Sequence, residues 1–413
     1  MDSEKKKQIA VWIITVVFSV VILFFGSKIC TKDLDIFDVA GAYTAKAVVT
    51  EIGEKIEDSY SLSNEVVYND ASLYFKAKVV SGDFKGQTLL AVQTSDNYVA
   101  GSSSEKEIQT GDKVILYNYG TPQGDADWVF GGYARFEPVM WLIIVFFVLL
   151  IAFGGIKGLN TIVSLGFTVL AVFAVFVPSV LSGFNIYVMT IITCVYTIAM
   201  TLLITNGATA KSLTTILGCT FGVLVAAVLE LLFDRLMMLT GITDEHSIYL
   251  QYLSSGVEIN LRALIFGMVV IGAMGAVMDV AMDISSSLAE VHHHAPDLGF
   301  IELVKSGLTI GRDVMGTMAN TLVLAYIGSS LCSILLLITY SSSLMELLNR
   351  ESIAVEIMQS LIGSTAILLT IPLTSIVCAV KYTAKEKGAV QEEKPALMKD
   401  EPVTFYYEGS KNE

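Results

Sequence analysis

Apolar residues are gathered in eight long runs that are separated by shorter polar segments. The first run extends from Ile9 to Gly26, and the others lie at about 138–156, 160–182, 185–205, 212–233, 262–284, 313–338 and 354–380. A helix needs roughly 20 predominantly apolar residues to cross the hydrocarbon core of a bilayer. The pattern predicts a polytopic α-helical membrane protein of about eight transmembrane helices, with an N-terminal anchor at 1–27 and a seven-helix bundle at 137–382. A cleaved signal peptide is the alternative to the anchor.

The segment between the first two runs, residues 28–136, has a soluble composition and a different periodicity. Apolar residues at alternate positions indicate half-buried strands, and Gly82, Gly86 and Gly111 mark turns between them. The predicted strands are Tyr43–Ile52, Leu73–Val80, Thr88–Gln93, Lys113–Tyr119 and Trp128–Phe136. Five short strands fit a small β-barrel of the OB type. The barrel lacks a basic face studded with aromatic residues, so we expect a docking or assembly module rather than a nucleic-acid binder.

The distribution of lysine and arginine predicts the orientation of the helices. The segments assigned to the inner side hold Lys5–Lys7, Lys157, Lys211, Lys305, Arg312, Lys381, Lys385 and Lys387, whereas the short outer loops hold only Arg235, Arg262 and Arg350, among many acidic residues. Cytoplasmic loops are enriched in basic residues. We therefore expect a multi-pass protein of the cell membrane with both termini in the cytoplasm and residues 28–136 outside. The charged segment 383–413 is predicted to be a disordered cytoplasmic tail.

Composition agrees with a membrane protein and excludes several function classes. Of the 413 residues, 54% are hydrophobic and 16% are charged, against about 25% charged in soluble domains. The net charge of −14 argues against nucleic acid as a partner. The chain has no P-loop, HExxH or GxSxG motif and its five cysteines form no CxxC pair, so neither an enzyme nor a cofactor nor a metal site is predicted. Whether His292–His294 bind a metal stays open.

Two carboxylates lie within the predicted sixth span. Gly272, Gly275, Asp279 and Asp283 recur at spacings of three and four residues, which places them on one face of a helix. Small residues on such a face allow a neighbouring helix to approach closely. A charged residue inside a membrane span is costly and is usually functional. Asp279 is therefore the strongest candidate for a proton- or cation-binding group.

The predicted seventh span carries polar residues at matching depth. Asp313, Gly316, Thr317 and Asn320 share a face, with Arg312 beside them. The sixth helix runs inward and the seventh outward, so Asp279 and Thr317 each lie about 6–7 Å above the inner membrane boundary at 1.5 Å per residue. We predict a proton- or cation-coupling site of Asp279, Asp283, Thr317 and Asn320, supported by Arg312, Asp313, Gly275 and Gly316. The alternative is that both aspartates fix helix packing through Asn320 and Arg312.

These two spans also resemble a known family. The segments GAMGAVMDVAMDISSSLAEV and SGLTIGRDVMGTMANTLVLAYIG are similar to signature blocks of the YibE/F family of bacterial membrane proteins, and the similarity extends over about residues 10–382. The resemblance implies an architecture rather than an activity. A more distant likeness is to the proton-driven bundles of SecD/SecF and RND proteins, which have six helices per unit.

Two functions remain open from the sequence. The first is a secondary transporter or ion-coupled exporter, with an intramembrane carboxylate as its proton- or cation-binding group. The second is a non-transporting assembly or accessory protein that recruits partners through the outer β domain. The partners expected are the lipid bilayer, a small substrate or ion, and a second copy or a paired homologue.

Overall fold

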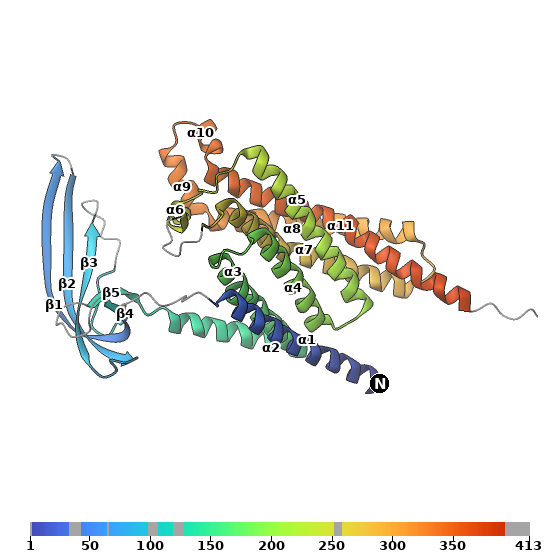
Figure 1. The fold of residues 1–413 in the computed structure, drawn as a ribbon, viewed down its shortest axis with the longest axis horizontal. Helices are drawn as coiled ribbons and strands as arrows, with labels where there is room; N and C mark the ends of the chain where they lie inside the picture. The colour runs from blue at the N-terminus through green and yellow to red at the C-terminus, as the bar shows by residue number, and fades with distance from the viewer. Residues whose placement is uncertain are drawn as a thin grey trace, which may run out of the picture. The chain divides into compact units, whose positions relative to one another are not determined.

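The computed structural model describes residues 2–32, 43–63, 66–97, 106–118, 128–251 and 258–392. Residues 2–8, 58–63, 66–70, 95–97, 245, 251 and 384–392 are described by their backbone alone. The chain divides into two compact units, one of residues 35–162 and one of residues 1–34 and 163–413. The first unit holds a β-barrel and the second a bundle of helices (Figure 1).

Five strands form the closed barrel of the first unit. They are β1 (Tyr43–Ser63), β2 (Val66–Ser81), β3 (Thr88–Asn97), β4 (Lys113–Asn118) and β5 (Trp128–Tyr133), and they are ordered β1-β2-β3-β5-β4, with β4 pairing back onto β1. The β3–β5 pair is parallel and the other pairs are antiparallel. A small five-stranded barrel between the first two helical regions is thus confirmed.

The alternating apolar positions of the strands fill the barrel interior. Phe75, Ala77 and Val79 of β2 are buried, as are Val114 and Leu116 of β4. The intervening residues point outward because successive side chains of a strand face opposite sides. This alternation is the feature that made the strands recognisable in the sequence.

Three strands, β1, β2 and β3, are longer than the sequence predicts, and β5 is shorter. β1 continues from Ile52 to Ser63, although 53–63 has no apolar alternation, because it pairs along its length with the first half of β2. Backbone pairing extends this hairpin beyond the core. β5 ends at Tyr133, and Phe136 instead begins a helix. Residue 119, the predicted end of the fourth strand, lies outside the described residues.

The helices of the chain follow the apolar runs. They are α1 (Asp2–Cys30), α2 (Phe136–Ala171), the π-helical turn η1 (Val172–Phe176), α3 (Val177–Leu181), α4 (Ile186–Asn206), α5 (Ala210–Met237), α6 (Glu245–Gln251), α7 (Leu261–His294), α8 (Phe300–Ser329), α9 (Leu331–Tyr340), α10 (Leu344–Asn349) and α11 (Glu351–Glu392). The side chains of Asn185, Thr209 and Asn260 accept hydrogen bonds from the first turns of α4, α5 and α7. Such N-caps fix where each of these helices begins.

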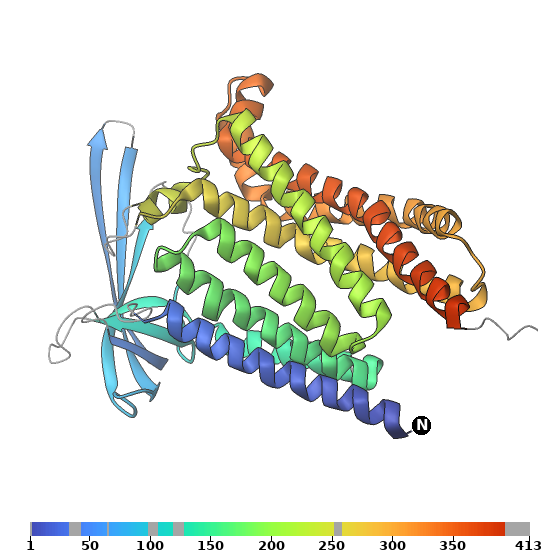
Figure 2. The ribbon, with the colours of Figure 1, turned by 45° about the vertical axis from the view of Figure 1, so that its right-hand side comes forward.

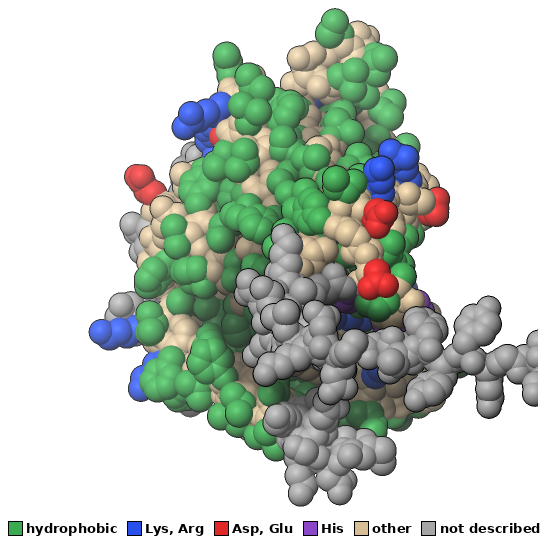
Figure 3. Space-filling view, turned by 90° about the vertical axis from the view of Figure 1, so that its right-hand side faces the viewer, with side chains coloured by type: hydrophobic (Ala, Val, Ile, Leu, Met, Phe, Trp, Pro, Cys, Tyr) green, Lys and Arg blue, Asp and Glu red, His purple; other side chains and the backbone are tan. Residues whose placement is uncertain are grey.

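Six helical segments are long and apolar enough to cross a membrane: Ile9–Cys30, Phe136–Leu181, Ile186–Asn206, Ala210–Met237, Leu261–His294 and Glu351–Thr383. A seventh is obtained if α8 and α9, which meet at an angle of 63°, are taken as one bent span. Hydrophobic side chains also cover much of the described surface in Figure 3. The segment Phe136–Leu181 is interrupted at Gly155, whose φ of 53° and ψ of −129° are not helical.

The bundle is built around α11, which contacts α5, α7 and α8 (Figures 1 and 2). Small residues permit these close contacts. Gly218 and Gly222 of α5 lie directly against Thr374 and Thr370 of α11, with no room for a side chain at either glycine. The buried cores on either side of α7 consist mainly of aliphatic residues.

The connections between the last helices differ from the prediction in two respects. α7 continues to His294, and only residues 295–299 separate it from α8. Leu288 and Leu303, on either side of this turn, are buried in one core cluster. α11 continues to Glu392, beyond the predicted start of the tail at 383, and residues 393–413 lie outside the described residues.

Two glycines of α8 should respond in opposite ways to replacement by alanine. A Cβ on Gly307 would overlap Ser375 of α11 and lie 3.1 Å from Leu288, whereas a Cβ on Gly328 would meet nothing within 4 Å. Overpacking a tight contact costs about 1–3 kcal/mol, while alanine in place of an open helical glycine gains up to about 1 kcal/mol. Thermal unfolding in detergent should therefore show a lowered Tm for Gly307→Ala and an unchanged or raised Tm for Gly328→Ala. Equal Tm values would contradict the packing of α8 on α11.

Candidate functional site

The predicted site residues of α7 lie on the one face of that helix that is not packed within the bundle. Gly272, Gly275, Asp279 and Asp283 are all exposed. The opposite face, with residues such as Val277 and Ile284, is fully buried. The spacing in the sequence therefore placed the two carboxylates on a common strip of the helix surface.

The predicted residues of α8 are likewise exposed. Leu303, Gly307 and Gly311 are buried, but no residue from 312 to 329 is. Along this outer part, the side of α8 that faces its neighbours carries Met318 and Leu322. The exposed residues include every predicted site residue of this helix: Arg312, Asp313, Gly316, Thr317 and Asn320.

Two contacts define how α7 and α8 are aligned. The Tyr326 hydroxyl lies directly against Gly272, and a side-chain carbon of Leu288 is 3.1 Å from where a Cβ on Gly307 would be. The two helices are antiparallel, with residue 272 beside residue 326 and residue 288 beside residue 307. Interpolating along the helix axes between these contacts places residue 279 at the height of about residue 317, and residue 283 at the height of about residue 313. The carboxylates of α7 and the polar residues of α8 therefore occupy the same levels along the two helices.

Level alignment does not bring these groups into contact within one chain. No hydrogen bond or ion pair is found among the predicted site residues, all of which lie in the described part of the chain; the Thr317 hydroxyl donates to the carbonyl of Val314 at 2.9 Å. Asn320 is two residues from both Met318 and Leu322, which places it about 200° around the helix from the packed side. Its amide points away from the α7 contact.

A second group of charged residues gathers where α5 ends and α7 begins. The guanidinium of Arg262 donates two hydrogen bonds to the carboxylate of Asp234, one of them 3.2 Å long from Nε. The side chain of Asp234 is 7% exposed, whereas that of Arg262 is 43% exposed. The pair ties the end of α5 to the first turn of α7, which begins after its cap residue Asn260.

Glu230 lies one helical turn before Asp234 and is almost fully buried, at 1% exposure. Neither of its carboxylate oxygens has a hydrogen-bond partner among the described residues. The partner of Arg262 is Asp234 and not Glu230. Burying a carboxylate without a partner is costly in its charged form.

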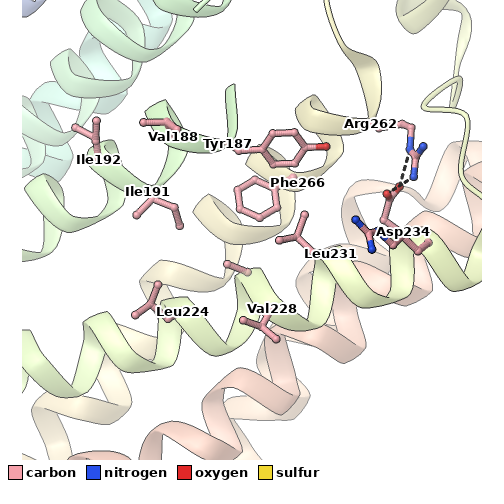
Figure 4. A pocket seen from close by; sticks show the side chains of 12 residues that line it. Tyr187, Val188, Ile191, Ile192, Leu224, Val228, Leu231, Asp234, Arg262 and Phe266 are labelled. Carbon is pink, nitrogen blue, oxygen red and sulfur yellow. Dashed lines mark hydrogen bonds and ion pairs between the residues drawn. The ribbon is translucent and has the colours of Figure 1, made fainter. Parts of the chain in front are cut away.

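A cavity of about 760 Å³ opens beside this group (Figure 4). Its walls are apolar side chains of α4, α5 and α7, and its floor includes the rings of Tyr187 and Phe266, whose centroids are 4.9 Å apart. Asp234 and Arg262 lie at one end (Figure 4). This site could not be predicted from the sequence, because its residues come from three helices. Only the i, i+4 spacing of Glu230 and Asp234 on α5 gives a local signal.

Replacing Glu230 by glutamine should leave the protein at least as stable as the wild type. The amide keeps the shape of the side chain and removes the charge that has no partner, so thermal stability should be unchanged or rise by about 1 kcal/mol. Tm in detergent measures this, with Glu258→Gln, an exposed carboxylate, as the control. A clear loss of Tm specific to Glu230→Gln would mean that the ionised carboxylate is held by a group that the described residues do not supply.

Two histidines of the run His292–His294 contact nearby side chains. His292 stacks on Tyr382 with ring centroids 4.9 Å apart, and Nε2 of His294 lies 3.0 Å from the carboxylate of Glu290. No group of three or more His, Cys, Asp or Glu side chains in the described ranges could hold a metal ion.

Comparison with known proteins bears on both sites. A family model described as YibE/F-like protein matches residues 142–384, more than half of the chain. The chain belongs to the YibE/F-like family. The YibE/F-like region includes α7, α8, the Asp234–Arg262 pair and most of α11, but not the β-barrel, so it is shorter than the predicted extent of 10–382. No curated protein and no solved structure matches the chain.

Proposed function

We propose that this YibE/F-like protein is an ion-coupled membrane transporter in which Asp279 binds and releases a proton or cation. The observation that carries the proposal is the strip of two unpaired carboxylates, Asp279 and Asp283, within the candidate span Leu261–His294. A purely structural carboxylate inside a bilayer is expected to have a fixed partner. The nearest level on α8 instead offers Thr317 and Asp313, which are typical of a site that exchanges an ion.

The architecture that we propose has eight membrane crossings, with both termini in the cytoplasm and the β-barrel outside. The segment Phe136–Leu181 has 46 residues, which as one helix would be about 69 Å long at 1.5 Å per residue, more than twice the roughly 30 Å hydrocarbon core. A break at Gly155 allows it to cross twice. With α8–α9 as one bent span, eight crossings result. The Greek-key strand order of the barrel supports the OB type.

Reporter fusions test this topology. A reporter after residue 60 should be active only outside the cytoplasm, and one after residue 390 only inside. Both results follow from the lysine and arginine distribution together with an even number of crossings. Activity on the same side for both fusions would contradict eight crossings.

Transport itself is tested in vesicles that contain the purified protein and a trapped pH-sensitive dye. After a pH gradient is imposed, salts of Na⁺, K⁺ and Mg²⁺ are added outside, one at a time. The transporter should dissipate the gradient when at least one of these ions is present. Behaviour identical to that of empty vesicles with every ion would favour the alternative, an assembly protein that recruits partners through its barrel.

A further inference from the structure

The exposed strips of α7 and α8 together form one surface, which we call the α7–α8 face: Gly272, Gly275, Asp279, Asp283, Arg312, Asp313, Gly316, Thr317 and Asn320. α7 and α8 are in contact, and Tyr326 of α8 covers Gly272 at the edge of the α7 strip. The two strips are therefore neighbours. In the proposed orientation Asp279, Thr317 and Asn320 would lie within the membrane, and Asp283, Arg312 and Asp313 at its inner boundary. A carboxylate directed at lipid there would be costly.

No other element of the described chain covers this face of α8. From Arg312 to Ser329, eighteen residues of a helix that lies in the bundle contribute no buried side chain. Gly275 and Gly316 both have open space where a Cβ would stand. Exposed small residues on a membrane helix allow the backbone of another helix to come close. Both observations are independent of the charges on the same face.

The charges indicate which molecule covers it. Copies of one chain insert in the same direction, so a two-fold axis between them runs along the membrane normal and each residue meets groups at its own level. Along the helix axes, Arg312 lies at nearly the same height as Asp283 and Asp313, and Asp279 lies at the height of Thr317. Near Asp283 and Asp313 the face carries the guanidinium of Arg312, and level with Asp279 it carries the hydroxyl of Thr317. A second copy would therefore present a cation or a hydrogen-bond donor to these carboxylates.

We propose that a second copy of this chain covers the α7–α8 face, and that the ion site is completed between the two copies. Arg312 of each copy pairs with a carboxylate of the other, and Asp279 meets the hydroxyl of Thr317 across the axis. The inference rests on the proposed function only for the role of Asp279. The dimer itself is argued from the uncovered charges and the exposed side of the outer half of α8.

Cysteine crosslinking in native membranes tests the proposal. Of the five cysteines only Cys332 is exposed, so Cys332→Ser gives a suitable background. Gly316→Cys and Thr317→Cys are the test variants. The first position has open space, and the Thr317 side chain is exposed and donates a hydrogen bond to the carbonyl of Val314 in its own helix. Val228→Cys, 64% exposed on α5, is the control on a different face.

Oxidation should convert the Gly316→Cys and Thr317→Cys proteins into a species of twice the 44.7 kDa monomer mass, with little conversion of Val228→Cys. Co-expression with a longer tagged copy should add a band of intermediate mass, which identifies the partner as the same chain. A covalent product of another mass would assign the face to a different protein. No product, while a thiol reagent labels both positions, would show that water rather than protein covers the face. Crosslinking that persists in Asp279→Asn without ion flux would retain the dimer and reject only the transport function.

Discussion

Asp279→Asn should insert and fold normally and yet lose ion-coupled flux down to the level of empty vesicles. The amide has nearly the same volume as the carboxylate and still forms hydrogen bonds, but it neither binds a proton at neutral pH nor carries a charge for a cation. The vesicle assay with the trapped dye measures the effect. Asp297→Asn, in the exposed turn between α7 and α8, should transport at the wild-type rate.

Asp279→Leu separates a coupling group from a packing residue. If Asp279 couples ion movement, both Asn and Leu abolish flux. If it only fixes helix packing, Asn is tolerated, whereas Leu leaves polar partners unsatisfied at a cost of about 1–3 kcal/mol. Full activity of a well-inserted Asp279→Asn protein, together with a destabilised Asp279→Leu protein, would reject the coupling role.

Arg262→Met should destabilise the protein much more than Asp234→Asn. Removing Arg262 leaves the buried carboxylate of Asp234, with a side chain 7% exposed, without a cation and one turn from Glu230. Breaking a buried ion pair in this way costs about 3–5 kcal/mol, and the lower end applies here because Arg262 is partly exposed. Asp234→Asn instead leaves the guanidinium of Arg262, which is 43% exposed and can be hydrated. The expected loss of stability is therefore only about 1 kcal/mol.

Thermal unfolding of the two single variants and the double variant measures this asymmetry. Asp234→Asn combined with Arg262→Met should be more stable than Arg262→Met alone, because no buried charge is then left unpaired. Equal loss in both single variants would mean that Asp234 is as well hydrated as Arg262, contrary to its burial.

The sequence predicted those features that depend on local periodicity. Alternating residues such as Phe75, Ala77 and Val79 located the barrel strands, and the apolar runs located the helices. The extension of β1 to Ser63 could not be predicted, because it follows from backbone pairing with β2. Pairing across a hairpin leaves no periodic signal in the outer strand segment.

The candidate sites also divide into features that local spacing predicts and features that depend on helix packing. Spacing alone placed Asp279 and Asp283 on one helix face, and counting residues from the predicted inner ends of the two spans placed Thr317 at a matching level. The pairing of Asp234 with Arg262, and the burial of Glu230 beside them, depend on how α5 and α7 pack at their ends. A single sequence contains no signal that distinguishes Glu230 from Asp234 as the partner of Arg262.

The most direct test of the central claim is to detect protonation of Asp279 in the membrane. Dicyclohexylcarbodiimide reacts with protonated carboxyl groups in apolar surroundings, and mass spectrometry locates the modified residue. We expect modification of Asp279 that increases as the pH is lowered and is absent from Asp279→Asn, with Asp297 unmodified in both proteins. An Asp279 that stays unmodified at every pH, while the protein remains folded and inserted, would contradict a role in binding and releasing protons.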